Sequence, residues 1–97
     1  MFSARLITHK DTNMLNICDS DLLGKTLNRD NFSLKISEKY YGEKVVEKEQ
    51  AEALLKESDS INMVGKEIIS LSVDMGIGSQ DGVKVIDGIP FLLVFKM

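Results

Sequence analysis

The first part of the chain alternates between apolar and polar positions, which predicts β-strands. Residues 2–8 alternate loosely, and the polar residues 9–12 that follow are typical of a turn. The stretch from Met14 to Cys18 then predicts a second strand. Two strands joined by a short polar turn indicate an N-terminal β-hairpin.

The strictest alternation lies in the middle of the chain. Phe32, Leu34 and Ile36 alternate with polar residues, which predicts one half-buried strand. The preceding segment, residues 27–31, is typical of a polar turn. Tyr40-Tyr41-Gly42 is expected to form a loop, with one tyrosine ring inside and one outside.

A helical pattern begins at Glu47 and runs to Ser58. Ala51, Leu54 and Leu55 share one helical face, and charged residues occupy the other. The acidic residues near its start suit the positive end of the helix dipole. We therefore expect an amphipathic helix here.

A second helix is expected to follow, capped by Asp59 or Ser60 and ending at Gly76. Its apolar stripe steps by three and four residues: Ile61, Val64, Ile68, Leu71 and Met75. Gly65 interrupts this helix, where glycine costs roughly 1 kcal/mol relative to alanine. The favoured interpretation is a close approach by another segment, the turn at 19–24 or a strand; space for a ligand is the alternative.

The C-terminal segment predicts another hairpin. Val83–Ile86 and Ile89–Phe95 flank Asp87-Gly88, a strong two-residue turn signal. Positions 91–95 are all apolar, which fits a strand buried on both faces or an edge that pairs with a partner. A homodimer joined through Ile89–Phe95 is therefore one structural hypothesis.

These elements predict a single α+β domain over residues 1–97. Its antiparallel or mixed sheet would have about five strands, formed by two hairpins and a middle strand, packed by two amphipathic helices. The length of 97 residues suits one domain.

The composition indicates the cellular compartment and excludes some classes of partner. The single cysteine cannot form an internal disulfide, which favours a reducing, cytoplasmic setting. No apolar run approaches the length of a membrane span, and the N-terminus lacks the pattern of a signal peptide. The net charge of −3 argues against non-specific binding to DNA or RNA. It leaves room for a local basic patch, because most basic residues lie between Arg5 and Lys56.

Gly24-Lys25-Thr26 has the ending of a phosphate-binding loop, but the loop's first glycine would fall at position 19, which is Asp19. A carboxylate there would repel phosphate. We instead expect Asp19 to cap a single helical turn by accepting from the amides of Asp21 or Leu22. Gly24 would then close that turn in a left-handed conformation.

The titratable residues do not form a convincing catalytic or metal site. His9 is the only histidine and lies in a predicted turn, and Cys18 is expected to be a small core residue. Asp19 and Asp21 lack the further oxygen ligands of a calcium loop. We therefore expect no cofactor and no metal. The alternative is a small enzyme or ligand-binding protein with Cys18, Asp19, Lys25 and Tyr41 around a cleft.

Several short motifs occur in an order that resembles a known family. They are Cys18-Asp19, Leu22-Leu23-Gly24-Lys25, Tyr40-Tyr41-Gly42, Asn62-Met63-Val64-Gly65 and Gly88-Ile89-Pro90. The set resembles a family of small archaeal proteins catalogued as domain of unknown function 424, over nearly the whole chain. The chain departs from the family pattern at Glu43, where a second glycine is expected. It also departs at Phe91-Leu92-Leu93, where family members often have a histidine and small residues, so no role of that histidine carries over.

The resemblance implies archaeal origin, a cytoplasmic α+β domain and no established activity. Genes of such proteins tend to lie beside those of translation factors. We therefore expect a non-enzymatic binding protein, transient or accessory, whose partner is the ribosome, ribosomal RNA or a translation factor. The expected contact residues are Lys25, Arg29, Tyr40, Tyr41, Lys44, Asn62 and Gly65. Asp19, Gly24, Gly42, Gly76, Asp87 and Gly88 are expected to shape the backbone.

Overall fold

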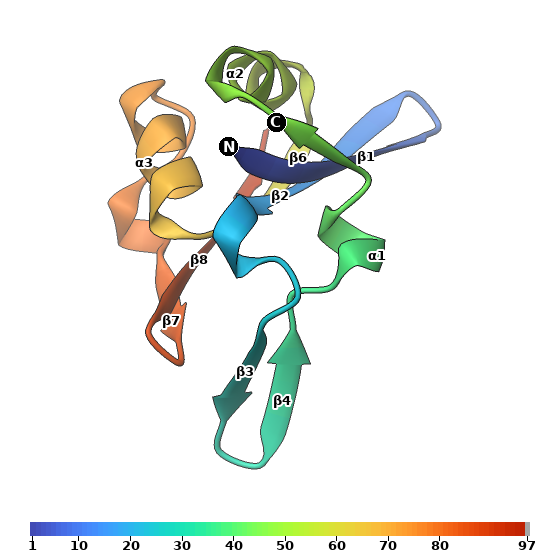
Figure 1. The fold of residues 1–97 in the computed structure, drawn as a ribbon. Helices are drawn as coiled ribbons and strands as arrows, with labels where there is room; N and C mark the ends of the chain where they lie inside the picture. Colours follow the sequence, from blue (N-terminus) through green and yellow to red (C-terminus); the bar gives the residue numbers. More distant parts are fainter. Residues whose placement is uncertain (97) are drawn as a thin grey trace.

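The structure is a computed structural model that describes residues 1–96. Its centre is a six-stranded mixed sheet with the strand order β5-β1-β2-β6-β8-β7 (Figure 1). The strands are β1 (Phe2–His9), β2 (Thr12–Asp19), β5 (Lys44–Val46), β6 (Ser60–Val64), β7 (Lys84–Ile86) and β8 (Ile89–Phe95). The α+β class and the mixed sheet are therefore confirmed, with six strands in the sheet instead of about five.

The remaining elements cover the two faces of this sheet. They are the hairpin β3 (Thr26–Arg29) and β4 (Phe32–Lys35), the helices α1 (Glu38–Tyr41), α2 (Lys48–Glu57) and α3 (Lys66–Asp74), and two short 3₁₀ turns, Ser20–Leu22 and Gln80–Gly82. Figure 1 shows α2 and α3 together on one side, and the β3-β4 hairpin extending away from the sheet near α1. Residues 1–96 contain three α-helices, where the sequence predicted two.

The sheet separates two hydrophobic clusters. Alternate side chains of each strand point to opposite faces, so neighbouring residues such as Ile17 and Cys18 belong to different clusters. The larger cluster packs the sheet against α2 and α3. The smaller one packs it against the hairpin and α1, through Leu27, Ile36 and Tyr41.

Both predicted hairpins of the main sheet are confirmed. β1 and β2 pair from Phe2↔Asp19 to His9↔Thr12, so only two residues form the turn. In the C-terminal hairpin, Asp87 and Gly88 have φ of 51° and 78°, as a two-residue turn of this handedness requires. The helix predicted from Glu47 is also confirmed, since Glu47 and Gln50 form a reciprocal capping box at the start of α2.

The prediction of a helix from residue 59 onward is wrong in its first half. Residues 60–64 form β6, parallel to β2 and antiparallel to β8, and the helix begins only at Lys66. Ile61 and Val64 fit both periods, but Ile61 and Met63 pack on the helix side while Val64 packs on the other. A short apolar run buried on both faces cannot be assigned by periodicity alone.

The strand predicted around Phe32 exists, but it is not half-buried. β4 pairs only with β3, outside the main sheet, and Phe32 is 55% exposed. The polar turn predicted before it is limited to residues 30–31, because Leu27 lies in β3 and is buried. Tyr40 and Tyr41 belong to α1 and not to a loop; the prediction that one ring is outside and one inside is confirmed.

The apolar C-terminal strand β8 is second from the edge of the sheet. β7 pairs only with residues 89–91, so the outer backbone edge of residues 92–95 has no strand beside it. Leu92 is buried, but Leu93 and Phe95 are 61% and 72% exposed. The interpretation as a strand buried on both faces is therefore wrong, and a homodimer through Ile89–Phe95 stays a prediction. Within residues 1–96 no helix has the length and apolar character to cross a membrane.

Asp19 caps α3 and not its own turn, which corrects the expectation above. Its Oδ2 accepts from the amide of Glu67 at 3.0 Å, and its Oδ1 accepts from the amide of Ile68 at 2.8 Å. Burial raises the pKa of the Asp19 carboxyl, and these two amide hydrogen bonds oppose the rise. The position where a phosphate would meet a helix N-terminus is thus filled by the chain's own carboxylate.

Gly65 makes this contact possible. It lies between β6 and α3 with a φ of +115°, and a Cβ added there would come within 2.4 Å of the Asp19 carboxylate. The close approach of the 19–24 region to Gly65 is the favoured interpretation above, although Gly65 precedes the helix instead of interrupting it. Gly24 has a φ of +89°, as expected, with open space around it.

We predict that Gly65→Ala destabilises the protein by about 3 kcal/mol or more, because backbone strain and overpacking add. Gly24→Ala is the matched control, with positive φ but no clash, and costs about 1–2 kcal/mol. Urea unfolding followed by circular dichroism measures both. Equal losses in the two variants would show that the contact with Asp19 does not constrain Gly65.

Candidate functional site

Three adjoining hollows lie on the face of the sheet opposite α2 and α3, and Asn62 of β6 lines all of them. The amide pocket is lined by Asn16, Leu34, Lys35, Ile36, Tyr40, Tyr41, Asn62 and Phe91, and has a volume of about 220 Å³. The side groove, of about 450 Å³, is lined by Leu34, Tyr41, Asn62, Gly82, Lys84, Ile86, Phe91, Leu92 and Leu93. The edge hollow extends from Asn62 to Met14 and Phe95. Together they form what we call the sheet groove.

Strand register builds the floor of the sheet groove. Asn16 of β2 is the partner of Asn62 in β6, and Asn62 is the partner of Leu93 in β8. Residues in register across a sheet project to the same face. Arg5 of β1 extends the row, since it pairs with Asn16. The result is a polar strip across β1, β2 and β6, which ends on β8 at the apolar residues Leu93, Phe91 and Phe95.

Tyr41 connects this floor to α1. Asn62 Nδ2 donates to the Tyr41 hydroxyl at 2.8 Å. Burial, mainly, raises the pKa of Tyr41 to about 12, so the hydroxyl stays protonated near neutral pH. Its own proton is then available to a ligand. Among the described residues no hydrogen bond engages the Asn16 side chain or Asn62 Oδ1.

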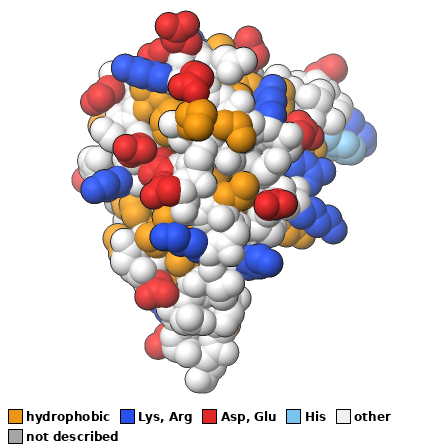
Figure 2. Space-filling view, viewed as in Figure 1, with side chains coloured by type: hydrophobic (Ala, Val, Ile, Leu, Met, Phe, Trp, Pro, Cys, Tyr) orange, Lys and Arg blue, Asp and Glu red, His pale blue; other side chains and the backbone are white. Residues whose placement is uncertain are grey.

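The sheet groove has no carboxylate among its lining residues, although the chain has a net charge of −3. Lys35 lines its amide pocket and Lys84 lines its side groove. Beside it, Arg5 donates from Nη1 to the carbonyl oxygen of Lys39 at 2.6 Å, and the Lys39 ammonium lies 6.0 Å from the centre of the Tyr40 ring. Figure 2 shows Lys and Arg side chains gathered on the right, over β1 and α1.

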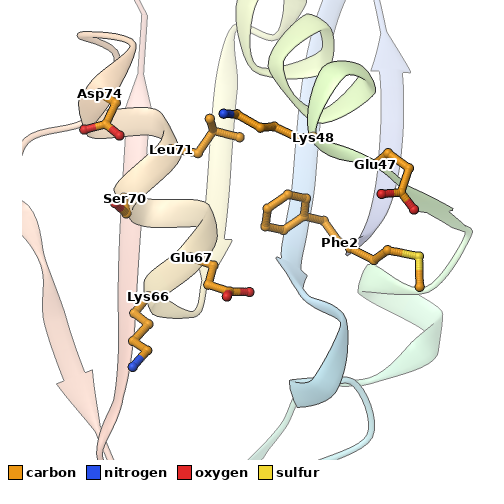
Figure 3. A pocket seen from close by; sticks show the side chains of 9 residues that line it. Phe2, Glu47, Lys48, Lys66, Glu67, Ser70, Leu71 and Asp74 are labelled. Atoms are coloured by element: carbon orange, nitrogen blue, oxygen red, sulfur yellow. The ribbon is translucent and has the colours of Figure 1, made fainter.

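A different hollow, of about 540 Å³, lies between α2 and α3. In Figure 3 the Phe2 ring lies between the two helices, and Lys48 extends above it toward α3. Carboxylates of Glu47, Glu67 and Asp74 surround this space together with Lys48 and Lys66. Mixed charges around a single buried aromatic ring, Phe2, fit a solvated seam between helices, so we place the candidate site on the opposite face.

Only some of the predicted contact residues meet at this site. Tyr40, Tyr41 and Asn62 do so in the amide pocket. Lys25 and Arg29 lie on the β3-β4 hairpin, Lys44 begins the edge strand β5, and Gly65 contacts Asp19; none of these four lines the sheet groove.

Sequence reasoning missed Asn16, Lys35, Lys84 and Phe91. Asn16 alternates with Leu15 and Ile17 in β2, so its face was readable from the sequence. Its meeting with Asn62 was not, because residues 60–64 were assigned to a helix.

The structure does not assemble the alternative cleft. Cys18 is fully buried, and burial, together with the charge of Asp19, raises the pKa of its thiol to about 12. A protonated thiol is a poor nucleophile. Neither Cys18 nor Lys25 lines the sheet groove, and no cluster of three or more His, Cys, Asp or Glu within residues 1–96 is arranged to hold a metal.

A family model described as "Protein of unknown function (DUF424)" matches residues 7–97. The chain belongs to this family. A solved structure similar to the DUF424 chain is described as "Crystal structure of an uncharacterized conserved protein from Methanopyrus kandleri". It has a TM-score of 0.80 and 27% sequence identity, and the match covers 99% of this chain and 93% of that one. No curated protein matches the sequence.

We predict that Cys18 resists alkylation in the native protein. At pH 8 its thiol is protonated and enclosed, so iodoacetamide should react only when the protein unfolds. Mass spectrometry of samples quenched over time, with protein in urea as the control, measures this. Native labelling as fast as labelling in urea would restore Cys18 as a candidate nucleophile.

Proposed function

We propose that this protein is a non-enzymatic, accessory binding protein of the translation machinery that contacts RNA through the sheet groove. The observation that carries the proposal is a concave, carboxylate-free surface of amides, aromatic rings and lysines on an otherwise acidic protein. RNA, as a component of the ribosome or bound to a translation factor, is the partner that this chemistry favours.

The side chains of the sheet groove match the needs of single-stranded RNA. Proteins recognise unpaired bases by stacking them on aromatic rings and bonding their edges to polar side chains, often on the open face of a sheet. Here Tyr40 and Phe91 supply rings, and Asn16 and Asn62 supply amides. Lys35 and Lys84 supply the positive charge that follows the phosphates.

The charge distribution supports an accessory role. Residues 47–74, which include α2 and α3, carry three lysines and the larger set of acidic residues Glu47, Glu49, Glu52, Glu57, Asp59, Glu67 and Asp74, so this segment is net negative. The two helices lie on the face of the sheet opposite the groove. A polyanion would approach the groove face and be repelled from the helix face, which favours one orientation. The link to translation comes from the resemblance, in which family genes lie beside those of translation factors.

We predict that the protein binds single-stranded RNA with a salt dependence set by Lys35 and Lys84. Replacing both by Gln should make the slope of log K against log salt shallower by about 1.4, or about 0.7 for each lost phosphate contact. Fluorescence anisotropy with a labelled oligonucleotide from 50 to 200 mM salt (about the range where such slopes are resolved) measures this. The matched control is Lys48→Gln with Lys56→Gln, on α2.

Two results would contradict this proposal. One is the absence of binding at low salt by the unaltered protein. The other is an equal loss in the α2 control, since this would place the contact on the helix face. A pulldown from native lysate at low salt tests the cellular part, and the absence of ribosomal particles and initiation factors would count against translation.

A further inference from the structure

We propose that the amide pocket receives one unpaired nucleobase of the bound RNA, held between Tyr40 and Phe91 and read by Asn62 and the Tyr41 hydroxyl. This inference rests on the proposed function and specifies the ligand of the same site. Three observations support the inference. They are the position of the aromatic rings, the hydrogen-bonding atoms on the pocket floor, and the residues that surround the pocket.

The aromatic rings come from two different elements. Tyr40 belongs to α1 and is 54% exposed, while Phe91 belongs to β8 and is partly buried. Both line the same pocket of about 220 Å³. Bases stack on aromatic rings, so a flat heterocycle in this pocket has a ring on each of two lining elements to stack on.

The pocket floor offers a neighbouring donor and acceptor. The Tyr41 hydroxyl accepts from Asn62 Nδ2, which leaves its proton to donate, and Asn62 Oδ1 can accept. All four RNA bases carry a donor and an acceptor side by side on one edge, so this pair is complementary to a base edge. Asn16, in register with Asn62, adds a second amide within the pocket.

The surroundings of the pocket favour an unpaired base. Leu34 and Lys35 of the hairpin and the tyrosines of α1 form walls above the sheet, so only a base turned out of a strand can reach the floor. Lys35 lies at the wall and no carboxylate lines the pocket, which suits the phosphates flanking that base. A duplex hides its base edges inside its stack and cannot offer them in this way.

The test is a cycle that combines protein and RNA changes. Binding of a single-stranded oligonucleotide is compared with binding of the same oligonucleotide carrying abasic positions, for the unaltered protein, Asn62→Ala and Tyr41→Phe. Tyr41→Phe keeps the buried ring and removes only the hydroxyl, and circular dichroism checks the fold of each variant. Asn31→Ala, at the exposed hairpin turn, is the matched amide control.

We expect the unaltered protein to lose about tenfold in affinity when the base is removed, which is typical of one stacked base. The Asn62→Ala and Tyr41→Phe variants should bind the intact oligonucleotide more weakly than the unaltered protein does. Removing the base should then lower the affinity of these variants only a little further. The salt slope should stay unchanged in both variants, because no phosphate contact is removed.

The outcomes separate this inference from the proposed function. If the unaltered protein binds no RNA, the proposed function fails. If RNA binds with the lysine-dependent salt slope but base removal has no effect, only the inference is overturned. If the two substitutions lower the affinity for intact and for abasic RNA by the same factor, Asn62 and Tyr41 act on the RNA backbone or on the fold of the protein. Base reading is then likewise overturned.

Discussion

The carboxylate of Asp19 accepts hydrogen bonds from the first amides of α3, and this contact joins elements that are far apart in the sequence. It links the end of β2 to the helix that follows β6. Gly65 gives it room, because a side chain there would occupy the carboxylate's position. With the end of β2 fixed to the start of α3, the parallel pairing of β2 and β6 is fixed as well, and Asn16 lies beside Asn62. The groove floor therefore depends on a capping contact on the other side of the same strands.

The six strands produce two unlike surfaces because side chains alternate along each strand. Facing α2 and α3, Leu15, Ile61 and Leu92 belong to a dry core. Facing away, the neighbouring positions hold Asn16, Asn62 and Leu93, partly or largely exposed. The first face holds the larger hydrophobic cluster, and the smaller cluster covers only part of the second face. The open part of the second face carries amides and apolar groups, and the proposed site lies there.

Sequence reasoning was accurate where a local signal was decisive. The Asp87-Gly88 turn, the amphipathic pattern of α2 and the loose alternation of β1 each require only neighbouring residues to be read. It failed at residues 60–64, where Ile61 and Val64 satisfy both periods and only the flanking strands β2 and β8 decide. It also failed for Asp19. The expectation that Asp19 caps a helix was correct, but the capped helix is α3, whose Glu67 amide lies 48 residues further along the chain.

The candidate site was half predictable for the same reason. Tyr40, Tyr41 and Asn62 stand out as motif residues. Their partners Lys35, Phe91 and Asn16 become neighbours only through strand register and the placement of the hairpin. Lys25, Arg29 and Lys44 were also expected to contact the partner, but neither a motif nor a charge locates a residue on a face of the sheet. A contact surface assembled from four strands and a helix has no signature in any single segment.

The second face of the sheet is only partly covered, and the proposed ligand site lies on its open part. The β3-β4 hairpin and α1 bury part of this face but leave Met14, Leu93 and Phe95 exposed. Each exposed apolar side chain forgoes about 25 cal/mol per Å² that burial would contribute. Closing the groove with one more helix would gain that energy but would enclose the amides of Asn16 and Asn62, which then require partners. An open groove keeps those amides solvated in the free protein, and under the proposed function it leaves them available to a base edge.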